Sequence, residues 1–169
     1  MHRILEYTIF YIALFLLQVF LFDNLSLSVY LAPLVYVSFL VMLPLNMKHG
    51  LLVIVGFVAG LILDIFTGTG GLHTIAATFT GFIRPGIVNI TMGKDFSKES
   101  GGIVTRRDIK SSKWLRYSAI LTLLHCAIYF MFEALTWKYF GYTLLKILLS
   151  SAFTVILVWF IGYIYPQRK

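Results

Sequence analysis

The stretch that decides the fold reads Gly-Phe-Val-Ala-Gly-Leu-Ile-Leu-Asp-Ile-Phe-Thr-Gly-Thr-Gly-Gly-Leu-His-Thr over residues 56–74, and an apolar run continues from it to residue 85. It predicts two membrane helices joined by a glycine-rich turn. Small residues and one carboxylate recur before the turn at intervals of four, which places them on one helix face: Gly56, Gly60, Asp64 and Gly68. Since such a face lets a neighbouring backbone approach closely, Asp64 is expected to point into the protein and away from lipid.

The second helix of this hairpin is expected to begin after Gly71 and to carry a matching stripe of small and polar residues: His73, Ala77, Gly81 and Arg84, with Pro85 directly after it. His73 should lie at about the depth of Asp64. Buried ionisable groups in a membrane favour a functional hypothesis, here a proton relay or an ion site. The structural alternative is a hydrogen bond that locks the hairpin, with Asp64 also capping backbone donors of the turn.

The composition indicates a helical membrane protein. Of the 169 residues, 59% are hydrophobic and 12% are charged, and the mean hydropathy is +0.87. Continuous apolar runs of 18 or more residues suit helices that cross a core of about 30 Å, whereas a barrel would show strand-like alternation. We therefore predict an all-α membrane protein with a single integral domain over residues 1–169.

Turn signals divide the chain into six predicted transmembrane helices, at about residues 4–22, 28–45, 50–66, 72–91, 115–137 and 142–165. Pro33 is expected in the first turn of the second span, where a missing N–H costs little. Pro85 interrupts the fourth span, and residues 86–91 either finish it or lie in the interface. Residues 92–114 form the one long polar segment and are predicted to be a cytoplasmic loop.

The distribution of positive charge predicts the orientation. With the N-terminus in the cytoplasm, twelve of the 14 Lys and Arg residues fall on the inner side, and only Lys138 and Lys146 fall outside. This bias predicts cytoplasmic N- and C-termini. The net charge of +7 is then explained by anionic lipid at the cytoplasmic loops, and nucleic acid is not needed as a partner.

Two further polar residues lie at equal distances from the turn between the last two spans. Antiparallel helices would bring Glu133 and Lys146 side by side, and we predict a helix–helix ion pair. Two sets of polar residues also predict a seam between these helices, namely His125, Tyr129 and Glu133 on one and Lys146, Ser150 and Thr154 on the other. Whether that seam takes a solute is left open by the sequence.

Motifs for catalysis or metal binding are absent from the sequence. It contains no Gly-x-Ser-x-Gly and no His-Glu-x-x-His pattern, and no serine lies near His73 or His125 in the chain. A metal site needs three or four ligands, and only Asp64 and His73 are expected to lie together. We therefore predict a protein that is not an enzyme and that has no metal or cofactor.

Six segments of the chain form a recognisable set: Leu-Leu-Gln-Val-Phe-Leu-Phe-Asp-Asn-Leu (16–25), Tyr-Leu-Ala-Pro-Leu-Val-Tyr-Val (30–37), Leu-Pro-Leu-Asn (43–46), Gly-Leu-Ile-Leu-Asp-Ile-Phe-Thr-Gly (60–68), Gly-Leu-His-Thr (71–74) and Phe-Ile-Arg-Pro (82–85). These segments resemble one known family, MreD, the bacterial rod shape-determining membrane proteins. The resemblance is close in the first half of the chain and extends to the second half by length and span count.

This resemblance implies a scaffold of the cell-elongation (rod) complex in the bacterial inner membrane. Such a protein would bind MreC and connect MreB filaments indirectly to the wall-building machinery, which includes RodA and a class B penicillin-binding protein. It would thereby support cell shape and lateral peptidoglycan synthesis. The implied fold is similar to the six-helix S-components of energy-coupling-factor transporters, and the alternative function is therefore that of a transporter component that binds a vitamin-like molecule.

Overall fold

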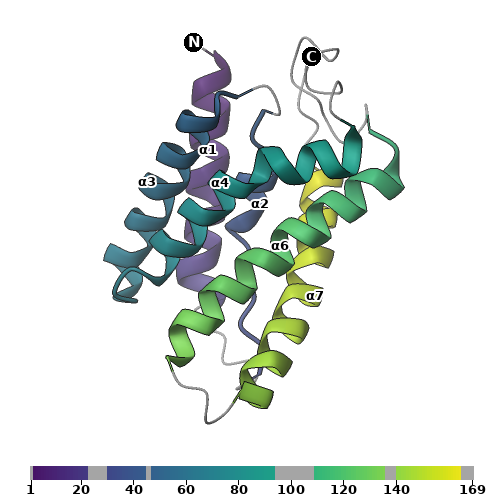
Figure 1. The fold of residues 1–169 in the computed structure, drawn as a ribbon. Coiled ribbons are helices and arrows are strands. Elements are labelled where there is room, and N and C mark those ends of the chain that lie inside the picture. The colour runs from purple at the N-terminus through teal and green to yellow at the C-terminus, as the bar shows by residue number, and fades with distance from the viewer. Residues whose placement is uncertain (1, 23–29, 45–46, 94–108, 136–139, 165–169) are drawn as a thin grey trace.

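The computed structural model describes residues 2–22, 30–44, 47–93, 109–135 and 140–164. Its regular elements are helices throughout this part of the chain, which confirms the all-α class (Figure 1). They are α1 (His2–Leu16), the π-helical η1 (Leu17–Phe22), α2 (Val37–Met42), α3 (His49–Thr67), α4 (Leu72–Met92), α6 (Ser111–Ala134) and α7 (Phe140–Ile164).

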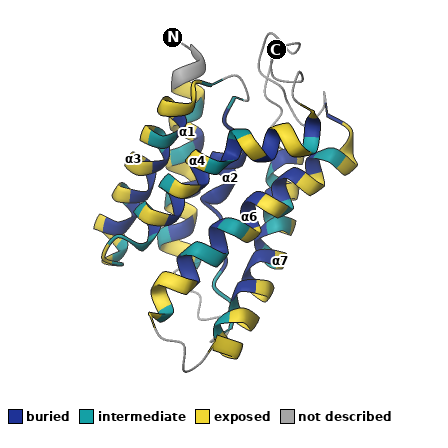
Figure 2. Cartoon of the chain, viewed as in Figure 1, coloured by how far each residue is buried: buried dark blue, intermediate teal, exposed yellow. Residues whose placement is uncertain are grey.

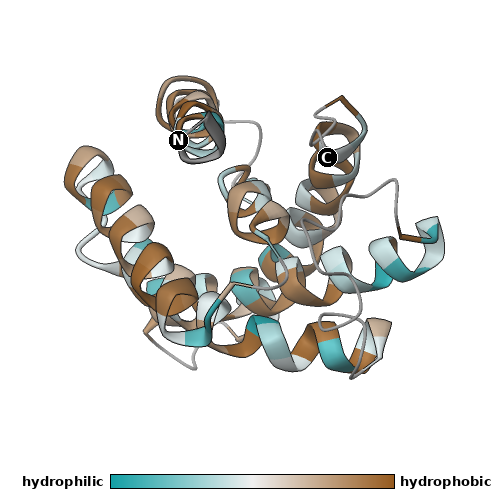
Figure 3. Cartoon of the chain, turned by 90° about the horizontal axis from the view of Figure 1, so that it is seen from above, coloured by the Kyte–Doolittle hydropathy of each residue, from teal (hydrophilic) through white to brown (hydrophobic). Residues whose placement is uncertain are grey.

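Four helical stretches of the described residues are long and apolar enough to cross a membrane: Leu5–Phe22, His49–Thr67, Ser111–Ala134 and Phe140–Ile164. Their outward-facing positions carry large apolar side chains, visible as exposed residues in Figure 2 and as the brown outer faces of the helices in Figure 3. A surface of this kind suits contact with acyl chains. These helices support a membrane protein, in agreement with the composition.

The predicted second span is wrong as a helix over most of its described residues. Among residues 30–44 the only helix is the six-residue α2, and residues 31–34 have no helical structure. Pro33 therefore does not lie in the first turn of a helix. A proline disfavours helical geometry in the residue before it, and side chains from other elements supply the hydrogen bonds that a helix would otherwise have made here.

This short helix occupies the centre of the molecule. All six residues of α2 are buried, as are residues 33–36 before it and Leu43 after it. The helix packs against α1, α4, α6 and α7, and it lies between these helices when the molecule is seen from above (Figure 3). These four helices thus surround a largely buried segment, residues 30–44, which we call the central segment.

The remaining boundaries differ from the predicted ones by a few residues. The helix α4 continues through Pro85 to Met92, and it bends along its length in Figure 1, as expected where a proline removes one backbone hydrogen bond. Residues 86–91 are therefore helical. The helix α6 begins at Ser111, so the end of the predicted 92–114 loop is helical. Positions 94–108 of that loop lie outside the described residues.

Figure 1 places the first residues of α1 and the last residues of α7 at the same end of the molecule. The helices α3 and α4 form one antiparallel hairpin, and α6 and α7 form a second. These two hairpins carry nearly all the residues that the sequence singled out.

Candidate functional site

The backbones of α3 and α4 lie in direct contact through glycine. A Cβ atom at Gly60 would lie 2.5 Å from the carbonyl oxygen of His73, and one at Gly56 would lie 2.5 Å from that of Ala77. From the other helix, a Cβ at Gly81 would lie 2.6 Å from the carbonyl oxygen of Leu52. The small-residue face predicted for this hairpin thus allows a close approach of two backbones.

Two other glycines of the hairpin lie in the turn between α3 and α4. Gly68 has a φ of 69° and ends α3, with its N–H donating to the carbonyl of Asp64 over 2.8 Å. Gly71 has a φ of 100° and precedes the first residue of α4. Both φ values favour glycine. The prediction that Gly68 extends the packing face is wrong, because α3 ends one residue earlier and nothing lies within 4 Å of a Cβ placed there.

Asp64 caps the start of α4. One carboxylate oxygen accepts the backbone N–H of His73 at 3.0 Å, and the other accepts the backbone N–H of Thr74 at 2.7 Å. The hydroxyls of Thr69 and Thr74 donate to the same two oxygens. The first N–H groups of a helix have no partner within the helix, and a carboxylate also complements the positive end of the helix dipole. The carboxylate therefore joins the two helices of the hairpin.

The ring of His73 faces the central segment instead. Its Nδ1 lies 3.1 Å from the hydroxyl of Tyr36, which in turn lies 2.8 Å from Nε2 of His125 on α6. The Nδ1 of His125 lies 2.8 Å from the hydroxyl of Thr80, which also bonds to the carbonyl of Ala76 at 2.7 Å. We call His73, Tyr36, His125 and Thr80 the histidine cluster; each of its members is buried.

The hydrogen bonds of the histidine cluster can all be satisfied with both imidazoles neutral. If the hydroxyl of Thr80 donates to Ala76, it accepts from Nδ1–H of His125, and Nε2 of His125 then accepts from Tyr36. The hydroxyl of Tyr36 is left to accept from Nδ1–H of His73. The cluster thus holds α2, α4 and α6 together without a buried charge, which a low-dielectric interior disfavours.

Arg84 forms a second cluster nearer the other end of α2. Its guanidinium donates to the hydroxyl of Tyr117 over 2.7 Å, to the carbonyl of Pro44 over 3.2 Å and to the carbonyl of Leu43. The Tyr117 hydroxyl donates to the carbonyl of Val41 over 3.1 Å. Arg84 is 1% exposed. The carbonyl end of a helix favours a cation, and Arg84 thereby fixes the end of α2.

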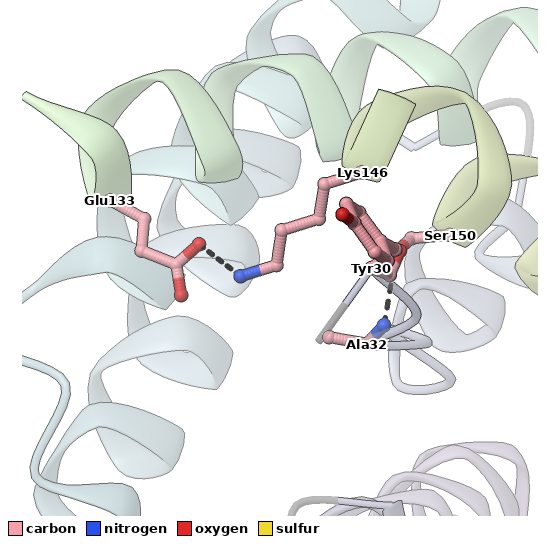
Figure 4. A network of polar contacts seen from close by, with 5 residues as sticks. All are labelled: Tyr30, Ala32, Glu133, Lys146 and Ser150. Atoms are coloured by element: carbon pink, nitrogen blue, oxygen red, sulfur yellow. Dashed lines mark hydrogen bonds and ion pairs between the residues drawn. The ribbon is translucent and has the colours of Figure 1, made fainter. Parts of the chain in front are cut away.

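The hairpin of α6 and α7 is closed by an ion pair. The Nζ of Lys146 lies 2.6 Å from Oε2 of Glu133 and 4.8 Å from the ring centre of Phe130. Figure 4 shows Lys146 reaching from α7 to Glu133, while Ser150 on the same helix lies beside Tyr30 and Ala32. The residues expected to form a helix–helix ion pair thus lie together, with side-chain exposures of 23% and 39%.

Apart from the Glu133–Lys146 pair, the predicted polar seam turns inward at Ser150 and Thr154 of α7. Ser150 and Thr154 accept the backbone N–H groups of Ala32 and Leu34, at 3.0 and 3.2 Å. The side chain of Gln18 in η1 accepts the N–H of Val35 at 2.7 Å and donates to the carbonyl of Pro33 at 3.2 Å. A non-helical backbone at membrane depth needs partners inside the protein, and these three side chains supply them.

Sequence reasoning missed the histidine cluster and the role of Arg84. It predicted a polar face for His125 but not its contact with Tyr36, which lies 89 residues away in the chain. No group of three or more His, Cys, Asp or Glu residues that could hold a metal ion occurs in the part of the chain that the structure describes. The buried side chains named above bind one another and the backbone.

Comparison of the chain with protein-family models, with curated proteins and with solved structures finds no match. The fold and the site define a class, a helical membrane protein with a buried polar core.

Proposed function

We propose that the chain is a non-enzymatic scaffold of the bacterial cell-elongation complex, of the MreD type. The proposal rests on the six segments that resemble MreD. One observation supports it, namely that each of these segments supplies a group to the buried hydrogen bonds of the structure: Gln18, Tyr36, the carbonyl of Leu43, Asp64, His73 and Arg84. The residues that carry the resemblance are thus also residues that hold the fold together.

The proposed partner is MreC, bound directly, with RodA, a class B penicillin-binding protein and MreB filaments in the same assembly. The described helices place mostly apolar side chains on the outside, so the proposed binding surface is embedded in the membrane. In such a complex the chain contributes shape and position: α3 and α4 pack too tightly to slide, and the central segment is held at both ends.

The proposed location is the bacterial inner membrane, with six passes of the chain and both termini in the cytoplasm. The second pass would be the central segment rather than a full helix. Reporter fusions at Gly102 and at the C-terminus test this arrangement. Both should fluoresce as cytoplasmic fusions, and phosphatase activity at either position would contradict the charge-based orientation.

The function is tested by depletion and by purification with MreC. Depletion should round rod-shaped cells, and the chain should bring MreC with it from a detergent extract. A matched pair of variants makes this specific: Gly60→Leu should lose MreC, whereas Gly141→Leu, at an open position in the first turn of α7, should keep it.

The competing function is that of a vitamin-binding transporter component. A thermal-shift screen of the purified chain against vitamins and nucleobases distinguishes the two. A specific upward shift of the unfolding midpoint, together with normal cell shape and lost uptake after deletion, would replace the scaffold proposal with the transporter one. Rounded cells with no ligand shift would support the scaffold.

A further inference from the structure

Two hydrogen-bonded bridges connect α2 to α6. At one end, the hydroxyl of Tyr36 bonds to Nε2 of His125 at 2.8 Å, within the histidine cluster. At the other end, the hydroxyl of Tyr117 donates to the carbonyl of Val41 over 3.1 Å, beside Arg84. Between the two bridges the helices pack against each other. The polar core therefore consists of two clusters with an interval between them.

Within that interval each helix carries one buried hydroxyl that makes no hydrogen bond among the described residues. Ser38 lies two residues into the five that separate Tyr36 from Val41, and Thr122 lies three residues into the eight that separate His125 from Tyr117. At a rise of about 1.5 Å per residue, Ser38 lies about 3 Å along its helix from Tyr36, and Thr122 lies about 4.5 Å from His125. The chain directions are opposite, so the two hydroxyls come at similar levels between the bridges.

Both hydroxyls lack a partner among the described residues. Ser38 Oγ and Thr122 Oγ1 make no hydrogen bond there, and both residues are 0% exposed. An unsatisfied buried hydroxyl destabilises a fold by roughly 1–3 kcal/mol. Other buried hydroxyls on the same helices or nearby are satisfied, as Ser118 is by the carbonyl of Leu115 and Ser151 by that of Leu148. Two orphaned hydroxyls at similar levels call for a shared partner.

We propose that Ser38 and Thr122 bind one internal water molecule, which lies between the histidine cluster and the Arg84 cluster. Water suits the site because it donates and accepts, and because buried waters characteristically bridge polar groups that have no other partner. This inference does not depend on the function proposed above.

An isosteric substitution tests the site, because the proposal and its alternative predict opposite changes in the midpoint of thermal unfolding. Thr122→Val preserves shape and removes the hydroxyl. If the hydroxyl were an unsatisfied group, its removal would raise the midpoint of thermal unfolding in detergent. If it holds a water, the variant should lower the midpoint by roughly 2–4 °C, because water and Ser38 lose a partner. Thr122→Ser retains the hydroxyl and should lie closer to the parent protein.

A double-mutant cycle completes the test. Ser38→Ala combined with Thr122→Val should cost little more than the worse single change, because either change already disrupts the shared water. Thr122→Val combined with Ser151→Ala is the control and should be additive. An experimental density map should show a water within about 3.2 Å of both hydroxyls. Additive effects in the first cycle, or a raised midpoint for Thr122→Val, would overturn the proposal.

Discussion

The two helical hairpins of this protein are held together by different means. In the α3–α4 hairpin the backbones touch, because Gly56, Gly60 and Gly81 leave no room for a side chain. In the α6–α7 hairpin the connection near the turn is made by the long side chains of Lys146 and Glu133. The arrangement of the α3–α4 hairpin depends on the fit between two backbones, so it should tolerate few substitutions at these glycines. That of the α6–α7 hairpin depends on flexible charged groups that retain contact with solvent, so it should tolerate substitution.

Both hairpins hold the central segment, one at each end. Ser150 and Thr154 of α7 accept the backbone N–H groups of its extended part, and Arg84 of α4 donates to the carbonyls after α2. The comparison can therefore be tested by making the same chemical change in each hairpin. We expect the α3–α4 member of each pair to have the larger effect.

The largest difference between the two hairpins is expected when a glycine is replaced by leucine. Gly60→Leu should abolish correct folding, at a cost of more than about 3 kcal/mol, because the new Cβ meets backbone atoms that cannot move independently. A Cβ at this position would lie 2.5 Å from the His73 carbonyl oxygen and 2.6 Å from Cα of Thr74. The yield of monodisperse protein in detergent measures the effect.

Gly141→Leu is the matched change in the other hairpin. No atom of the described residues lies within 4 Å of a Cβ at Gly141, which is in the first turn of α7, and leucine has the higher helix propensity. Its yield should equal that of the parent protein. Equal yields of the two leucine variants would show that the close backbone contact does not determine the fold of α3 and α4.

The next largest difference in the free energy of unfolding is expected when the buried cation Arg84 and the half-buried cation Lys146 are each replaced by methionine. Arg84→Met should lower the free energy of unfolding by about 3 kcal/mol, because the hydroxyl of Tyr117 and carbonyls after α2 lose their donor. Lys146→Met should cost less than about 1 kcal/mol, as is usual for ion pairs that contact solvent. Titration with sodium dodecyl sulfate measures both.

Arg84→Lys sharpens this prediction. Lysine preserves the charge but lacks the planar fork that serves several acceptors at once, so its stability should fall between those of the parent protein and Arg84→Met. If Arg84→Lys were as stable as the parent, charge alone would fix the end of α2, and the geometry of the hydrogen bonds would be unimportant.

A smaller difference is expected for the two carboxylates. Asp64→Asn should destabilise by about 1 kcal/mol, the usual effect of a lost helix cap. Asparagine offers one acceptor oxygen, whereas the two oxygens of Asp64 serve the N–H groups of His73 and Thr74 separately. One backbone donor is therefore left without an acceptor. Glu133→Gln, the same chemical change, should have less effect because Glu133 accepts from a flexible lysine.

The Asp64 variant also separates structure from proton chemistry. In the capping interpretation, loss of stability and loss of function should go together across Gly60→Leu and Asp64→Asn, with the glycine variant the more damaged. Suppose instead that Asp64→Asn folds as well as the parent and loses all function, while Gly60→Leu stays active. Asp64 would then be an ionisable working group, and the capping interpretation would be wrong.

Local sequence patterns predicted the α3–α4 hairpin because its contacts repeat along each helix. The four-residue spacing of Gly56, Gly60 and Asp64 identifies the buried face without any knowledge of the neighbour. The α6–α7 pair was also accessible, because equal distances from a turn place Glu133 opposite Lys146. Where a contact follows from helix periodicity or from a single turn, the sequence contains enough information to find it.

The central segment was not predictable in this way. Residues 30–44 are as apolar as the other spans, and nothing local shows that Gln18, Ser150 and Thr154 will bond to their backbone. The histidine cluster likewise joins residues that are far apart in the chain. Such contacts depend on how whole helices are arranged, and periodicity carries no information about that arrangement.

The smallest predicted effect concerns the ion pair of the α6–α7 hairpin. A double-mutant cycle of Glu133→Gln and Lys146→Met should give a coupling energy of about 0.2–1 kcal/mol at low salt, because both groups remain in contact with solvent. Their side-chain exposures of 23% and 39% leave the pair open to screening.

Raising the ionic strength should reduce that coupling further, since the Debye length falls from about 10 Å at 0.1 M to about 3 Å at 1 M salt. The effect of Arg84→Met should change little over the same range, because Arg84 is buried and its partners are dipoles rather than ions. If salt weakened the Arg84 interaction as strongly as the Lys146 pair, the buried cation would be reached by solvent. The division of this molecule into a hairpin held by shape and one held by exposed charge would then fail at Arg84, a buried residue of the first hairpin.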